Sequence, residues 1–253
     1  MKKWLLLFIV IILGLAFVVY NNSNIKSIIS GLDKEGDIKS GELRYRIYLF
    51  GILPVGEAVF GVEKIEQYQG QKVYHLSATA QSLNVFSKFF NGTVALDSYI
   101  DIKQLTSLVF KEKIAISGKQ GIDREITYDQ KNGIMSIAGV KRQILPDTQD
   151  PLSAIFNLKR FNFDKIKDIE MNINTNHKNY ILKGTTIQQE ILINKKIYKI
   201  VSTQAEIRRR DKNPYHKSSI TIVLLKEKEN IPILIKVFAS GVLINAHLIE
   251  IRQ

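Results

Sequence analysis

From Glu42 onward, hydrophobic and polar residues alternate in short runs that are separated by turn-forming residues. In the runs 42–50, 57–65 and 72–80, every second residue is apolar, which is the pattern of a β-strand with one buried face. The same alternation recurs at residues 107–116, 122–129, 218–225, 231–239 and 242–251. Because the runs repeat every ten to fifteen residues or so, they predict antiparallel strands connected by hairpins.

Three glycines in the first predicted hairpin suggest that the sheet is curved. Gly51, Gly56 and Gly61 follow one another at intervals of five residues. Glycine inside a strand commonly marks a kink or a bulge, which a tightly curling sheet needs. We therefore expect a mainly β protein built as a strongly curved antiparallel sheet or an incomplete barrel, with one or two short covering helices.

Two segments within the strand-rich region are predicted to be short helices. Residues 83–90 are broadly apolar, and residues 151–160 carry a complete helix-start signal. Asp150 is placed to accept hydrogen bonds from the first-turn amides, and Pro151 occupies the first helical position. This cap is fully explained by a structural role and requires no functional one.

The predicted helix 151–160 has one apolar face, formed at helical spacing by Leu152, Ile155 and Phe156. Asn157, Lys159 and Arg160 are expected to face water. Such a helix beside a curled sheet is expected to cover the apolar face of that sheet, either as a fixed plug or as a moving lid.

The N-terminus predicts export. Lys2 and Lys3 precede residues 4–20, which contain no charged side chain. A helix of this length spans roughly 26 Å, at the short limit for crossing a bilayer, and the two lysines favour retention of the N-terminus in the cytoplasm. The expected organisation is an N-terminal signal-anchor or signal peptide at 1–20, a polar linker at 21–40 and an exported β domain at 41–253.

Two locations are compatible with this organisation. An uncleaved segment 4–20 would hold the chain in a bacterial inner membrane as a single-pass protein whose domain faces the periplasm. Cleavage after the small residues Gly14 and Ala16 would instead release a soluble periplasmic protein.

Composition narrows the classes of function. The 253 residues include 36 Lys and Arg and 24 Asp and Glu, for a formal charge of +12, and there is no cysteine. The charge favours anionic partners such as lipid head groups or acidic polysaccharide, whereas export makes nucleic acid an unsuitable partner. The absence of cysteine excludes disulfides, thiolate catalysis and iron–sulfur clusters.

The run 41-GELRYRIYLFGILPVGEAVF-60 resembles the entry motif of an uncharacterised bacterial envelope family, known as domain of unknown function 3108. The segments 97–101, 124–129, 149–154 and 231–248 each resemble a segment of that family, in the same order. The likeness extends over roughly residues 41–251, although the tryptophan often found before the Ile-Pro strand is absent. The resemblance implies an exported, mainly antiparallel β domain, and it implies no established activity.

Two groups of residues are candidate binding sites. An apolar ligand cavity would be lined by Phe86, Phe89, Phe90, Ile155 and Phe156, for which the alternative is ordinary core filling. Anionic groups would be bound by Arg208, Arg209, Arg210 and Lys212, for which the alternative is an exposed loop tip before Pro214.

No catalytic, metal-binding or cofactor-binding motif is found. Asp97 and Asp101 are about 13 Å apart along a strand, too far to act on one substrate atom. The four histidines share no metal-ligand spacing, and nucleophile and phosphate-loop motifs are missing.

We therefore expect a non-enzymatic envelope protein that binds an anionic amphiphile such as a lipid, or an envelope polymer. The alternatives are a protein-interaction or scaffold subunit of an envelope assembly and, third, a glycan hydrolase. A carrier predicts an open apolar cavity. A scaffold predicts a packed interior with an exposed apolar patch, and a hydrolase predicts acids or histidines clustered in a cleft.

Overall fold

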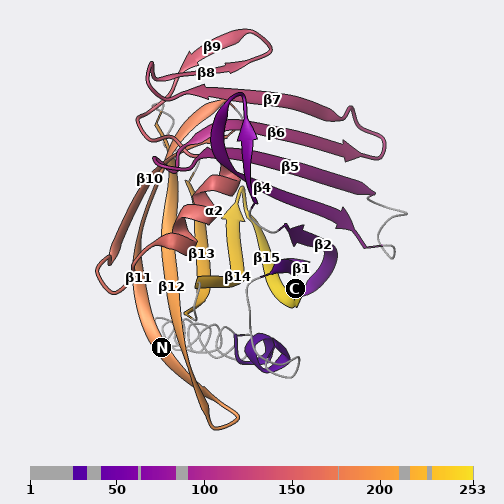
Figure 1. The fold of residues 1–253 in the computed structure, drawn as a ribbon. Helices are drawn as coiled ribbons and strands as arrows, with labels where there is room; N and C mark the ends of the chain where they lie inside the picture. Colours follow the sequence, from indigo (N-terminus) through magenta and orange to yellow (C-terminus); the bar gives the residue numbers. More distant parts are fainter. Residues whose placement is uncertain are drawn as a thin grey trace, which may run out of the picture.

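The computed structural model describes residues 25–32, 41–61, 64–83, 91–175, 177–210, 217–226 and 230–252. Strands dominate these residues (Figure 1). The strands are β1 (Glu42–Leu49), β2 (Leu53–Phe60), β3 (Lys64–Tyr68), β4 (Gln71–Ser82), β5 (Gly92–Asp101), β6 (Ser107–Ile116), β7 (Ile122–Asp129), β8 (Ile134–Ile137), β9 (Val140–Gln143), β10 (Asp168–Thr175), β11 (Lys178–Ile193), β12 (Lys196–Arg209), β13 (Lys217–Lys226), β14 (Asn230–Ala239) and β15 (Val242–Arg252).

The 15 strands form one large open antiparallel sheet in the order β10-β11-β12-β13-β14-β15-β1-β2-β4-β5-β6-β7-β8-β9, with β3 paired to β4. Almost every strand pairs with its neighbour in sequence, as expected for hairpin connections. The exceptions are the pairing of β2 with β4 and the pairing of β15 with β1, which runs from Glu42 opposite Arg252 to Leu49 opposite Ile244. Consequently the first and last strands lie in the middle of the sheet, and the two edges are β9 and β10.

The sheet is strongly curved. Strands β10–β14 run roughly vertically in Figure 1, whereas β4–β7 run roughly horizontally. The turn between these directions begins at β1 and β2, where the register shifts between Ile47 and Tyr48 opposite Gly56. A Cβ atom on Gly56 would lie 2.8 Å from the backbone oxygen of Gln81, so the close approach of β2 to β4 requires glycine.

The two edges of the sheet approach each other across the segment between β9 and helix α2 (Pro151–Arg160). In that segment Gln149 forms an isolated bridge with Ile173 of β10. Its amide donates to the Asn172 carbonyl, and its carbonyl accepts from the Asn174 amide, each at 2.8 Å. Gln149 therefore links the segment after β9 to the edge strand β10, and the Asn179 side chain adds a 2.9 Å bond to the Gln143 carbonyl at the end of β9.

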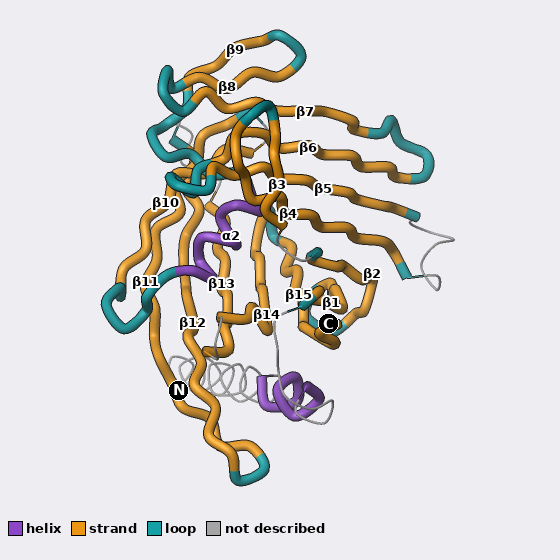
Figure 2. Tube along the Cα trace, in the orientation of Figure 1, coloured by secondary structure: helices purple, strands orange, loops and turns teal. Residues whose placement is uncertain are grey.

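Helix α2 lies against the sheet in front of β13 and β14 (Figure 2, purple). It also contacts β4, β5 and β10, so it packs between the two differently oriented parts of the sheet. The covering helix predicted at 151–160 is confirmed, and so is the antiparallel sheet. The strand predicted at 57–65 is wrong in its bounds, because β2 ends at Phe60 and a separate strand, β3, begins at Lys64.

A second helical segment covers residues 25–32. Its residues Ile25, Ile29 and Leu32 are buried in a cluster with the lower ends of β11 to β14 and with β1. The linker expected over residues 21–40 therefore contains a packed helix, because these three apolar residues recur at helical spacing. The helix expected at 83–90 lies outside the described residues, apart from Leu83, which follows β4. No helix in the described part of the chain is both long and apolar enough to traverse a bilayer.

Candidate functional site

Helix α2 begins as its sequence predicts. The Asp150 Oδ1 atom accepts hydrogen bonds from the amides of Leu152 and Ser153, at 2.8 and 3.0 Å. Asp150 has extended backbone angles, and Pro151 starts the helix. This geometry satisfies two of the amides that a helix N-terminus leaves without partners.

The same carboxylate is held from its other side by the sheet. The hydroxyls of Ser98 on β5 and Ser107 on β6 donate to Asp150 Oδ2, at 2.6 and 2.7 Å. The Asp150 amide in turn donates to the Ser107 hydroxyl at 2.7 Å. These contacts fix the start of α2 to two strands.

The chemistry available to Asp150 is limited by its burial. The side chain is inaccessible to solvent, and this burial raises the pKa of the carboxyl, although the hydrogen bonds from Ser98, Ser153 and Ser107 oppose the shift. With four donors already directed at its two oxygens, the carboxylate has no free position for a substrate. We interpret Asp150 as the structural attachment of α2 to the sheet.

The body of α2 fills the space between the two parts of the sheet. Leu152 and Phe156 are buried in the cluster formed by β4 to β8, and the Phe156 ring lies 5.1 Å from that of Tyr74. Ala154 and Leu158 are buried in the other cluster, formed by β10 to β14. The helix is therefore buried on two sides and attached to the sheet at its start, which is the arrangement expected of a plug.

One predicted orientation of α2 is wrong. Asn157 does not face water: it is 7% exposed, and its Nδ2 donates to the Leu105 carbonyl at 2.8 Å. Ile155 is only partly buried, so the apolar face is rotated relative to the prediction. The reason is tertiary, because α2 is enclosed on two sides and a chain carbonyl provides a partner for the amide. Lys159 is half-buried and Arg160 is exposed, with the guanidinium 4.7 Å from the Phe156 ring centre.

The aromatic candidates Phe86, Phe89 and Phe90 lie outside the described residues. Ile155 and Phe156 are therefore the candidates that can be placed. Phe156 contributes to a packed cluster and not to an open cavity.

The basic candidates belong to a strand and its end. Arg208 and Arg209 are the last residues of β12, and Arg210 follows in a bend, whereas Lys212 lies outside the described residues. Consecutive residues of a strand point to opposite faces, so Arg208 and Arg209 do not converge on one ligand. Arg208 is also paired with Glu206 of its own strand. The loop tip that the sequence suggests at 208–210 is thus mainly strand.

The two acidic residues Asp97 and Asp101 contact different partners. Asp97 contacts His75 Nε2 at 2.8 Å, while Asp101 accepts from the amides of the turn that follows it. The His75 Nδ1 atom lies 3.5 Å from Glu66 Oε1. Because both ring nitrogens face carboxylates, His75 has no nitrogen directed at a substrate, and we interpret it as a surface link between β3, β4 and β5. The part of the chain that the structure describes contains no cluster of three or more residues suited to binding a metal.

An uncharged end of the sheet was not identified from the sequence. Residues 47–56 and 237–246 contain no Lys, Arg, Asp or Glu. They meet at the β1–β2 turn, where Leu49 is opposite both Ile244 and Leu53. The most exposed apolar side chains at this end are Ile52, 73% exposed, and Phe50, 57% exposed. Leu53, Phe238 and Ile244 are exposed there as well. The sequence signal that could have identified this end is that two runs without charged residues each contain a turn, at 50–52 and at 240–241.

A polar cluster lies next to this uncharged end. Arg46 is paired with Glu57 at 2.7 Å, and the rings of His247 and Tyr48 are 4.6 Å apart. Burial, followed by the charge of Lys236, lowers the pKa of His247 to about 4. The ring is therefore neutral at physiological pH and contributes to packing.

A hollow of about 550 Å³ lies at the other end of the sheet. It is bounded by helical residue Lys26 and by β11 residues Gln189, Glu190, Ile191 and Leu192. The lining combines apolar and charged side chains of both signs.

The sequence model for proteins of unknown function DUF3108 matches residues 44–241. The chain belongs to the DUF3108 family. This membership confirms the resemblance noted from the 41–60 run and from the ordered segments that follow it. Among curated proteins, no relative matches this DUF3108 protein.

A solved structure confirms the type of fold. The DUF3108 chain is similar to the crystal structure of a beta-barrel-like protein of domain of unknown function DUF1849 from Brucella abortus, with a TM-score of 0.54 and 9% identity. The alignment covers 84% of this chain and 98% of the other. At this identity the likeness concerns the fold alone.

Proposed function

We propose that this DUF3108 domain is a non-enzymatic interaction subunit of a bacterial envelope assembly, tethered to the inner membrane by residues 4–20 and facing the periplasm. The observation that carries the proposal is the combination of a fixed plug with an exposed uncharged end. Of the functions considered from the sequence, a scaffold is the one that requires a packed interior and an exposed apolar patch.

The plug argues against a carrier that opens at α2. Release of the helix would expose Phe156 and Leu158, each 2% exposed, and would leave the Asp150 carboxylate without Ser98 and Ser107. Burial of large apolar side chains contributes about 2 kcal/mol each, so this opening is costly.

The uncharged end has the composition of a protein interface. Interface centres are depleted of charged residues and enriched in aromatic and large apolar ones. Exposed apolar patches on soluble domains commonly mark binding surfaces. A partner protein that covers Phe50, Ile52 and Ile244 would remove these side chains from water without desolvating a charge.

Amphiphile binding is the second candidate, and the hollow beside Lys26 favours it. Its volume of about 550 Å³ falls within the size range of small-molecule sites. An anionic head group would meet Lys26, and an acyl chain would meet Ile191 and Leu192. In this alternative the ligand lies outside the plugged interior.

Photo-crosslinking in intact membranes tests the leading proposal. A benzophenone side chain is placed at position 50 or 52 of the full chain, and the control carries it at Val140, which is 58% exposed on β9. We expect one adduct of defined mass from positions 50 and 52, no such adduct from position 140, and loss of the adduct on Ile244→Asp. Equal labelling from position 140 would contradict the proposal. A purified chain with one stoichiometric lipid in native mass spectrometry, lost on Leu192→Asp, would favour the second candidate.

A further inference from the structure

The β11–β12 hairpin projects beyond the rest of the sheet. The two strands contain 16 and 14 residues and remain paired from Tyr180 opposite Arg209 to Ile193 opposite Lys196. Their turn is formed by Asn194 and Lys195, with φ angles of 48° and 68°. Figure 1 shows this turn as the lowest point of the hairpin, at the same end as helical residues 25–32.

The tip of this hairpin is apolar on both faces. One face is buried, since Ile191, Ile193 and Tyr198 share a cluster with Ile25 and Ile29 of the helix. The other face presents a cross-strand pair, Leu192 opposite Ile197. These two side chains are 64% and 61% exposed.

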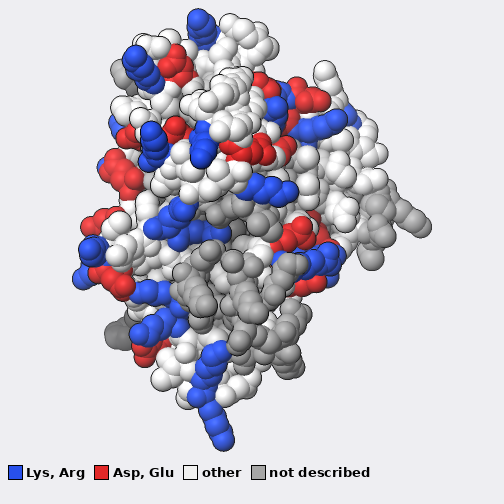
Figure 3. Space-filling model, viewed as in Figure 1, with Lys and Arg blue, Asp and Glu red and all other residues white. Residues whose placement is uncertain are grey.

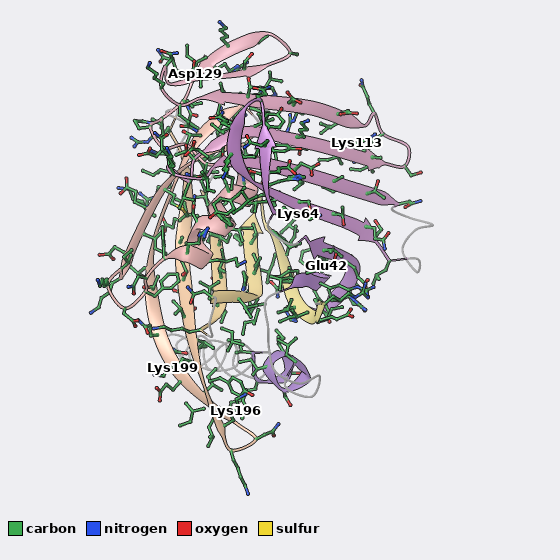
Figure 4. All side chains as sticks on the ribbon, in the orientation of Figure 1. Glu42, Lys64, Lys113, Asp129, Lys196 and Lys199 are labelled. Carbon is green, nitrogen blue, oxygen red and sulfur yellow. The ribbon has the colours of Figure 1, made fainter. Side chains whose placement is uncertain are left out.

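Lysines flank the exposed pair. Lys195 in the turn is exposed, and Lys199 lies two residues beyond Ile197 on the same face. Lys196 is exposed next to them, and its ammonium lies 4.8 Å from the centre of the Tyr198 ring on the opposite face of the hairpin. Figure 3 shows blue side chains at the lowest point of the molecule, and Figure 4 places Lys196 and Lys199 on the projecting part of β12. Glu190 is the acid nearest in register, 3.8 Å from the Lys199 Nζ. Exposed apolar residues flanked by lysines have the composition of segments that lie at a membrane interface.

The chain's own connectivity brings this tip toward a bilayer. The apolar run ends at Tyr20, and the helix that packs on the hairpin is already formed at Ile25. Five residues extend at most about 18 Å, and the eight-residue helix is about 12 Å long. Ile25 is therefore within about 18 Å of Tyr20, which keeps the end of the sheet that packs on this helix near the membrane surface when residues 4–20 are inserted.

We infer that the β11–β12 tip contacts the surface of an anionic membrane. Leu192 and Ile197 enter the head-group region, and Lys195 and Lys196 meet the lipid phosphates. The inference rests on the proposed membrane tether, and it adds a second point of contact between the chain and the membrane. Two points of contact hold the strands in a defined orientation, which a single flexible attachment does not.

This arrangement directs the uncharged end away from the membrane. The strands from β11 to β1 alternate in direction, so the turns at 50–52 and 240–241 lie at the opposite end of the sheet from the β11–β12 turn. The basic end suits anionic lipid, and the uncharged end suits protein. Because the tether makes the tip contact intramolecular, a small apolar pair is sufficient to populate it.

Tryptophan fluorescence of the full chain in lipid vesicles tests the inference. The native chain has one tryptophan, Trp4, within the apolar run. Two further variants carry Trp4→Phe together with either Ile197→Trp at the tip or Ile52→Trp at the uncharged end as a matched control. Each protein is reconstituted separately in phosphatidylglycerol vesicles and in phosphatidylcholine vesicles. Both kinds of vesicle contain brominated acyl chains as the quencher.

We expect quenching of Trp4 in both lipids, quenching of the tryptophan at position 197 mainly in phosphatidylglycerol, and no quenching at position 52. Lys195→Gln with Lys196→Gln should lower the ratio of inserted to free tip by about fivefold for each lysine replaced. Quenching of Trp4 without quenching at position 197 overturns the inference and leaves the tether intact. Failure of Trp4 to be quenched overturns both, and quenching at position 52 in place of 197 reverses the assigned orientation and overturns the inference.

Discussion

Replacement of Asp150 tests whether α2 is a fixed plug. Asp150→Ala removes the acceptor for the amides of Leu152 and Ser153 and for the hydroxyls of Ser98 and Ser107. A buried donor left without a partner costs about 1–3 kcal/mol. Two terms reduce the total: the desolvated charge is removed, and the Ser107 hydroxyl keeps its contact with Ser153 at 2.7 Å. We expect the free energy of unfolding to fall by about 3–5 kcal/mol.

Asp150→Asn is the matched control. It keeps the shape of the side chain and one carbonyl oxygen for the first-turn amides, while its amide group faces serine hydroxyls that can also accept. The expected loss is about 1–2 kcal/mol, the scale of one imperfect hydrogen bond. Guanidinium unfolding of the full chain in a mild detergent, followed by far-ultraviolet circular dichroism, measures both variants. An alanine variant within about 1 kcal/mol of the native chain would refute the attachment of α2 through Asp150.

Other changes follow from features of the sheet. His247 has a folded-state pKa of about 4 against 6.5 when exposed, so its stabilising effect is complete above pH 6.5 and is lost as the pH falls toward 4. We expect the native chain to lose about 1–2 kcal/mol over that range, after allowance for partial exposure of the ring, and His247→Phe to flatten this part of the stability profile. Asp150 has the opposite effect, because its pKa is raised in the folded state: its contribution to stability is complete below pH 3.8 and is lost as the pH rises. The difference in unfolding free energy between the native chain and Asp150→Asn should therefore narrow with rising pH. Gly184→Ala places a Cβ 2.7 Å from the Ala205 Cα and should cost about 1–3 kcal/mol in chemical denaturation, whereas Gly31→Ala, with no atom within 4 Å, should be neutral or stabilising. Tyr45→Phe removes the 2.7 Å bond to the buried Pro232 carbonyl and should lower the unfolding free energy by about 1–2 kcal/mol, and a larger loss would indicate that the ring also shifts.

Features with local physical causes were predictable from the sequence. The start of α2 depends on Asp150 and Pro151, two adjacent residues whose capping geometry requires nothing distant. The strand alternation at 42–50 and 72–80 reflects one buried face, which persists in β1 and β4. The pairing of β15 with β1 is different, because no local pattern distinguishes it from other antiparallel arrangements.

The projecting hairpin was missed for a physical reason. Between Lys183 and Glu190, both faces of β11 are largely exposed. This part of the strand therefore lacks the alternation of apolar and polar residues that identifies a strand with one buried face. Helical residues 25–32 were missed because a helix of two turns gives too short a period to recognise against polar neighbours.

The candidate basic site illustrates the same limit. Adjacent arginines look like a cluster along the sequence, yet a strand sends Arg208 and Arg209 to opposite faces. Asn157 shows the converse, because its burial depends on the Leu105 carbonyl, which is 52 residues away in the chain. Neither result follows from residue type or spacing.

The central position of β1 and β15 has a consequence for the order of folding. Arg44 and Glu250 meet at 3.3 Å although 206 residues separate them. Strand β1 is synthesised early, but its partner on one side is β15, which is synthesised more than 190 residues later. The middle of the sheet therefore has an unpaired edge until β15 has been made, and such edges are prone to aggregation. Closure of this long-range pairing is expected to be a slow, late step of folding, at which a folding factor would have most effect.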